Sequence, residues 1–134
     1  MQSSGETRFT FSSEQRLRFG WQFDKIFRIG FRENRALVRL LFLKGQSSKK
    51  VGVTVSKHIA HACGRTRGKR ILREACRHIF PYMEDGLWLC VSLTQRGLTA
   101  KTQDVYKEIV SVLKKKNLLN ENFTVHKWQT SQGK

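Results

Sequence analysis

The residues of this sequence best suited to binding chemistry are cations gathered in one short segment. Between Arg65 and Arg77 the chain carries six Lys or Arg side chains and a single acid, Glu74. Guanidinium groups form paired hydrogen bonds with phosphate oxygens. A solvated helix face usually mixes Glu with Lys, so this unbalanced segment predicts a site for a polyanion. At about 100° per residue, one helical arc of about 100° holds four of the cations, namely Lys69, Arg70, Arg73 and Arg77.

A second set of residues with binding chemistry is an apolar, largely aromatic stripe upstream. Its members are spaced i, i+4, i+7 and i+8, which predicts one face of a helix running from Gln15 to Gly30: Phe19, Phe23, Ile26 and Phe27. Such a stripe usually packs in a core. If the helix crosses the edge of a sheet, part of the stripe instead lines a groove, where rings beside cations such as Arg16, Arg35 and Lys57 would stack on unpaired bases. Both interpretations stay open for Phe19 and Phe23.

The acids, histidines and cysteines of this sequence do not show the spacing of a catalytic site. Only Glu84 and Asp85 are adjacent acids, and the chain has no Asp-x-Asp pair and no Gly-rich phosphate loop. His58, His61 and Cys63 lie close together, but no second ligand pair accompanies them, so no metal site is expected. The three cysteines lack a CxxC spacing and are expected to be reduced and mostly buried. No catalytic residue is therefore predicted in this chain.

Composition indicates the same kind of partner. The 134 residues carry a formal net charge of +16, far more than solubility requires. A membrane surface is the rival partner, but the longest apolar runs, 40–43 and 87–91, are too short to span a bilayer, so no membrane contact is expected. The N-terminal residues show no secretory signal, and we expect a cytoplasmic protein.

The elements that must position these residues follow from periodicity. Residues 36–43 form a nearly continuous apolar run, and valines alternate with small polar residues over 51–55, so both segments are predicted strands, paired as an antiparallel hairpin across the turn 45–50. A helix over about 67–81 stops at Pro81. A third strand spans 87–93, with leucines and Val91 on one side and Trp88, Cys90 and Ser92 on the other.

A last helix and two terminal segments complete the predicted organisation. Thr102 is expected to cap the helix and Asp104 to lie in its first turn, above a buried stripe of Val105, Ile109, Val112 and Leu113. We expect one domain over 16–119, preceded by a flexible segment, 1–15, in which Phe9 and Phe11 allow a short edge strand. Residues 120–134 read as a C-terminal tail.

The order of elements and the basic segment together resemble the protein component of bacterial ribonuclease P. The family's Phe-x-x-x-Phe-x-x-Gly pattern is similar to residues 23–30, and its strand-ending Val-Ser-Lys to residues 55–57. Its Arg-rich helix is similar to residues 65–77, and the likeness covers about 16–119. The resemblance implies an α/β sandwich with a mixed sheet, an αβββαβα order and a left-handed β-α-β crossover.

The resemblance also implies a function and a set of site residues. It implies that a catalytic RNA subunit, using Mg²⁺ that it binds itself, removes the 5′ leader from precursor tRNA while the protein assists, with no oligomer implied. The residues expected to contact the RNA subunit are Arg65, Thr66, Arg67, Lys69, Arg70, Arg73 and Arg77. Those expected to border the cleft for the single-stranded leader are Phe23, Phe27, Arg35, Ser56 and Lys57.

The sequence departs from the family in the loop before the basic helix. His58, Ala60, His61 and Thr66 stand where the family usually has Lys, Gly, Asn and the Asn of an Arg-Asn-Arg signature. Thr66 has no carboxamide with which to read a base edge, whereas the electrostatic part of the resemblance is unaffected. A structural RNA-binding protein of ribosomal or chaperone type, with no role in cleavage, is the alternative from a different class.

Overall fold

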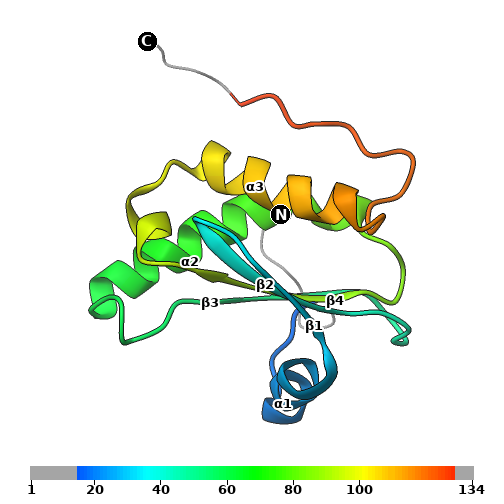
Figure 1. Ribbon diagram of the computed structural model, residues 1–134, viewed down its shortest axis with the longest axis horizontal. Coiled ribbons are helices and arrows are strands. Elements are labelled where there is room, and N and C mark those ends of the chain that lie inside the picture. Colours follow the sequence, from blue (N-terminus) through cyan, green and yellow to red (C-terminus); the bar gives the residue numbers. More distant parts are fainter. Residues whose placement is uncertain (1–14, 129–134) are drawn as a thin grey trace, which may run out of the picture.

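A mixed four-stranded sheet with helices on both faces forms the body of the protein (Figure 1). The computed structural model describes residues 15–128. In chain order the elements are α1 (Gly20–Ile29), β1 (Phe31–Asn34), β2 (Val38–Leu43), β3 (Lys50–Thr54), α2 (Ala62–Arg77), β4 (Trp88–Leu93) and α3 (Thr102–Lys115). Short 3-10 helices at Phe80–Tyr82 and Arg96–Thr99 flank β4. The expected αβββαβα order is confirmed.

Alternating side chains of the central strands build two cores. On one face, under α2 and α3, lie Leu87, Leu89, Val91 and Leu93, together with Leu40 and Phe42 of β2. On the other face Trp88, Cys90, Leu41 and Leu43 pack beneath Ile26 of α1. The alternation predicted for residues 87–93 is therefore confirmed, and it separates the α1 face of the sheet from the α2/α3 face.

The predicted antiparallel pairing of residues 36–43 with 51–55 is wrong. The strand order is β1-β2-β4-β3, so β4 lies between the two, antiparallel to β2 and parallel to β3. The physical reason is burial: β2 and β4 are apolar on both faces and need central positions, whereas β3 alternates valines with Gly52 and Thr54 and tolerates an edge. Strand β1, with the polar sequence Arg-Glu-Asn, forms the other edge.

Helix boundaries differ from the predictions at four places. Helix α1 begins at Gly20, because residues 15–19 are used to approach β3. Helix α2 begins at Ala62 and ends at Arg77, and Pro81 lies in the following 3-10 turn. Lys101, in an extended conformation, is the N-cap of α3, so Thr102 is already helical and the predicted cap is wrong. The buried stripe of α3 is confirmed.

Three further findings concern the predicted segments outside this body. Residues 120–128, in the predicted tail, pack together with Leu119 against α2 and α3. The predicted edge strand at Phe9 and Phe11 lies outside the described residues. In the described part of the chain, no helix has the length and apolar character needed to cross a membrane.

Candidate nucleic-acid interface

The exposed side of α2 carries the predicted cations, and most of them have no acidic partner in the described part of the chain. Among residues 15–128, no acidic side chain pairs with Arg67, Lys69, Arg70 or Arg73. Acids of these residues therefore do not relieve the repulsion among these cations, and a polyanion would relieve it. We call Lys69, Arg70, Arg73 and Arg77 the cationic face of α2.

Three predicted contact residues have side chains committed to local bonds. Arg77 Nη2 lies 3.0 Å from Glu74 Oε2, which partly neutralises that end of the cationic face. Arg65 Nη1 donates to the Ala60 carbonyl oxygen at 3.0 Å, so this side chain ties the loop to α2. The Thr66 hydroxyl donates to the Ala62 carbonyl oxygen at 3.1 Å, which is a bond within the helix.

A groove at the outer edge of β3 brings cations from two parts of the chain together. Its volume is about 320 Å³, and it is lined by Lys69 and Arg73 of α2, by residues 51–53 of β3 and by Arg16 and Leu17. The segment before α1 is held there by two backbone hydrogen bonds, from the Leu17 amide to the Val51 carbonyl (3.0 Å) and from the Val51 amide to the Gln15 carbonyl (2.9 Å). Of the described residues that line this groove, three are cations and none is an acid.

The aromatic stripe of α1 divides between core and surface. Ile26 is fully buried, whereas Phe27 is 43% exposed and Phe19 is 47% exposed. Phe23 is half-buried and packs against the smaller core, and its ring stacks on that of Phe27 with centroids 6.5 Å apart. Core packing and exposure on the surface therefore apply to different residues of the stripe. Phe19 and Phe27 are surface rings, and Phe23 belongs to both core and surface.

A polar row crosses the sheet on its α1 face, beyond the part that α1 covers. The register aligns one residue from each strand: Asn34, Arg39, Ser92 and Thr54. All are exposed or half-exposed, and Thr54 Oγ1 lies 2.7 Å from Ser92 Oγ. The row offers hydrogen-bonding groups and one cation beside the aromatic rings. Sequence reasoning missed it, because only the register of the strands brings these four positions into line.

The five residues predicted for the leader cleft lie in three places. Phe23 and Phe27 are together on α1, while Ser56 and Lys57 are exposed just after β3. Arg35 lies in the turn after β1, at the opposite edge of the sheet, where its Nη2 is 3.0 Å from Glu33 Oε2. Three strand spacings of about 4.8 Å put the two edges about 14 Å apart. A single ligand that contacts all five residues must therefore extend across the sheet.

Potential metal ligands are scattered in the described part of the chain. Within residues 15–128, no three His, Cys, Asp or Glu side chains are close enough together to hold a metal ion. Cys63 is exposed, while burial raises the pKa of Cys76 and of Cys90 to about 12, so both buried thiols stay protonated. The arrangement is suited to binding an extended anionic ligand.

Comparison with known proteins agrees with this geometry. The family model described as Ribonuclease P matches residues 11–117. The ribonuclease P protein component of Chlamydia muridarum is 41% identical over 76 residues, covering 55% of this chain and 64% of the relative. That of a Pseudanabaena species is 27% identical over 113 residues, covering 82% of this chain and 97% of the relative.

Solved structures share the fold. The RNase P protein of Staphylococcus aureus superposes with a TM-score of 0.67 at 20% identity, covering 78% of this chain and 97% of that one. The RNase P protein from Thermotoga maritima gives a TM-score of 0.65 at 23% identity, covering 75% of this chain and 96% of that one. The cationic groove at the edge of β3 and the exposed rings of α1 thus lie on a fold that these proteins also have.

Proposed function

The chain belongs to the ribonuclease P protein family, and from this premise we propose that it assists a catalytic RNA subunit in removing the 5′ leader from precursor tRNA. As a member of that family it is the protein component of an endoribonuclease that processes tRNA. The proposed assistance to the RNA subunit rests on the geometry at β3. The cationic groove lies at the outer edge of this strand, and the aromatic side of α1 packs on the face of the sheet next to it.

The cationic face of α2 is proposed to bind the RNA subunit. A helix presents its side chains at regular intervals along a rod, which suits it to follow phosphates along a folded RNA backbone. Lys69 and Arg73 also line the groove with Arg16, so the same face continues onto the edge of the sheet. The two predicted contacts Arg65 and Thr66 would then act mainly by shaping the start of α2.

The α1 face of the sheet is proposed to receive the single-stranded leader. Exposed rings of Phe27 and Phe19 offer stacking surfaces that do not depend on base identity. The polar row provides hydrogen-bonding groups further along the same face, and a strand of several nucleotides would reach from these rings toward Ser56 and Lys57. Phe23 would support the exposed ring of Phe27 from below.

Bond cleavage is proposed to occur on the RNA subunit. Mg²⁺ binds phosphate and carboxylate oxygens, and bound Mg²⁺ supplies an activated water for phosphodiester hydrolysis. The role of this chain is to neutralise phosphates where the RNA subunit and the substrate meet, which lowers the Mg²⁺ concentration that assembly requires. We place this complex in the cytoplasm, and the proposal needs one copy of the protein.

Reconstitution tests the proposal directly. Purified protein is added to a bacterial ribonuclease P RNA and a precursor tRNA at a low Mg²⁺ concentration, and release of the 5′ leader is followed. We expect leader removal only when protein and RNA subunit are both present. Cleavage by the protein without the RNA subunit, or equal cleavage with and without the protein, would contradict the proposal. A protein that binds the RNA yet leaves cleavage unchanged would identify a structural RNA-binding protein instead.

A further inference from the structure

The segment 119–128, which we call the strap, follows α3 in the sequence and packs on α3 and on the C-terminal end of α2. The Asn120 amide donates to the Tyr82 carbonyl oxygen at 2.7 Å. The ring of Phe123 meets that of Tyr82 edge-on, with centroids 5.3 Å apart. These contacts hold the start of the strap. A different set of residues holds its far end.

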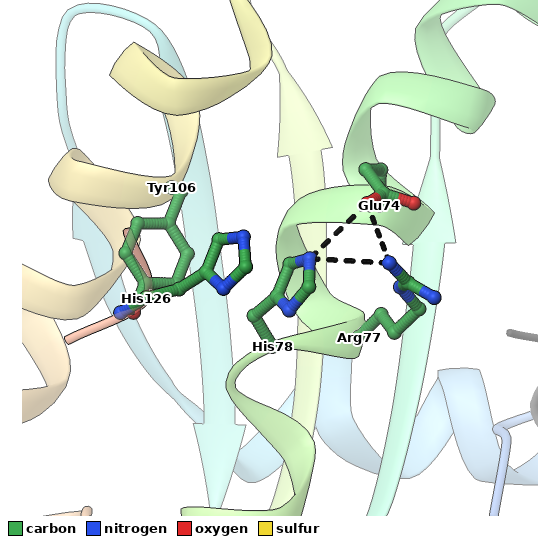
Figure 2. Close-up of polar contacts among 5 residues, drawn as sticks. All are labelled: Glu74, Arg77, His78, Tyr106 and His126. Carbon is green, nitrogen blue, oxygen red and sulfur yellow. Dashed lines mark hydrogen bonds and ion pairs between the residues drawn. The ribbon is translucent and has the colours of Figure 1, made fainter. Parts of the chain in front are cut away.

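Two stacked imidazoles hold the far end of the strap. His126 of the strap lies face to face with His78, the residue after α2, with ring centroids 3.5 Å apart and an interplanar angle of 12° (Figure 2). The His126 amide donates to the hydroxyl of Tyr106 on α3 at 2.8 Å. Trp128 packs edge-on against both rings, with centroids 5.0 Å from His78 and 4.6 Å from His126.

The charged groups around this pair leave little room for additional positive charge. Among residues 15–128, Glu74 Oε2 is the carboxylate oxygen that contacts the cluster, and it accepts hydrogen bonds from both Arg77 Nη2 (3.0 Å) and His78 Nε2 (3.1 Å) (Figure 2). Arg77 Nη2 is also 3.4 Å from His78 Nε2, and Tyr106 contributes a neutral phenol from α3. Protonating His78 would add a positive charge beside Arg77, next to the Glu74 carboxylate that both side chains contact.

The pKa of His78 is shifted in the direction that this crowding predicts. Burial lowers the pKa of His78 below its ordinary value of 6.5, and repulsion from His126 and Arg77 acts the same way, while Glu74 partly offsets them. If His78 regains its ordinary pKa when the strap leaves, the released state binds more protons than the docked state. Docking is then favoured at neutral pH and weakened as the pH falls below about 6.5.

We propose that the strap is a pH-sensitive latch: the His78–His126 stack holds it on α2 and α3 at neutral pH, and protonation of His78 releases it in mildly acidic solution. Each additional proton taken up on release changes the ratio of released to docked strap by up to about tenfold per pH unit. Release would uncover Arg77, the last cation of the cationic face. The latch needs no RNA, so it stands or falls separately from the proposed function.

Nuclear magnetic resonance of the full chain tests the latch. Hydrogen exchange of the His126 amide and the chemical shift of the Trp128 indole are compared at about pH 7.5 and about pH 5.5. We expect the His126 amide to lose its protection and the indole signal to shift at the lower pH. Circular dichroism is expected to stay unchanged, because the sheet and its helices do not depend on the strap contacts.

Substitutions of single histidines separate His78 from other titrating groups. His78→Gln retains a donor for Glu74 but takes up no proton between about pH 7.5 and about pH 5.5, so its strap is expected to stay docked at the lower pH. The matched control, His58→Gln, removes an exposed imidazole from the loop after β3, and it should release like the wild-type chain. His78→Phe, which keeps an aromatic ring in the stack, serves the same purpose if His78→Gln does not dock at neutral pH.

The outcomes are decisive in both directions. Equal protection of the wild-type His126 amide at the two pH values would overturn the proposal. Release of a docked His78→Gln or His78→Phe strap at the same pH as wild type would also overturn it, because a different group would then be titrating. Loss of pH dependence in a docked His78 variant, with wild-type behaviour in His58→Gln, would establish the latch.

Discussion

The cationic face of α2 makes a quantitative prediction about how salt weakens RNA binding. Each phosphate neutralised by a Lys or Arg contributes roughly −0.7 to −0.9 to the slope of log affinity against log salt concentration. Four cations, Arg67, Lys69, Arg70 and Arg73, have no acidic partner among the described residues. They should therefore contribute about −3 to −4 to the slope.

The perturbation is the double substitution of Lys69→Ala and Arg73→Ala, which removes both α2 cations from the groove. It should flatten the slope by about 1.5, so between roughly 50 and 200 mM salt the affinity lost to salt should shrink by about eightfold. The assay is binding of the RNA subunit, measured by anisotropy at four or five salt concentrations. Both side chains project from an exposed helix face, so the fold should be retained.

The matched control removes the same charge from the other helix on that face of the sheet. Lys107→Ala with Lys115→Ala takes two exposed cations from α3 and should leave the slope nearly unchanged. Equal flattening in both double variants would mean that net charge, rather than the face of α2, governs binding. An unchanged slope in the α2 variant would refute the assignment of this face.

Three further predictions test other parts of the structure. Phe27→Ala should weaken binding of precursor tRNA more than of mature tRNA, by about 1–3 kcal/mol if the exposed ring stacks on one leader base; equal losses would exclude a leader contact. Glu108→Ala should lower the free energy of unfolding in urea by about 1.5–3 kcal/mol, because Glu108 Oε1 accepts the backbone amides of residues 37 and 38 at 2.8 and 2.9 Å and the substitution removes this acceptor; an unchanged midpoint would show that these bonds add nothing. A thiol reagent at about pH 8 should modify Cys63 alone in the native protein, since the other two thiols are buried with raised pKa values; reaction of two or three thiols would contradict that burial.

Hydrophobic periodicity predicted which face of each element is buried better than it predicted which strands pair. The alternation over 87–93 and the apolar stripe of the last helix each depend on the local pattern alone, and the structure confirms both. The pairing of β2 with β3 was wrong because both segments look like strands around a polar turn, and nothing between them signals that β4 enters the space. Only the need to bury both faces of β4 decides that question.

The same distinction explains how much of the candidate site the sequence could predict. The cationic face lies on one helix, so residue spacing was enough to find it. The polar row takes one residue from each of four strands, and no spacing along the chain relates Asn34 to Thr54. Arg16 was predicted to be helical, and its place in the groove became visible only when residues 15–19 proved to run along β3.

Strand β3 joins the two halves of the interface, and Gly52 is the position where they depend on each other. A Cβ atom at Gly52 would lie 3.1 Å from Leu17 and 3.3 Å from the ring of Phe23, closer than most such contacts in proteins. A larger side chain there would push Leu17 and the neighbouring Arg16 away from Lys69 and Arg73, and it would also disturb the ring that supports Phe27. The cationic groove and the aromatic surface therefore cannot be placed independently, because both rest on one small residue in an edge strand. A basic composition alone would bind RNA, but joining phosphate contacts to base stacking requires this local packing.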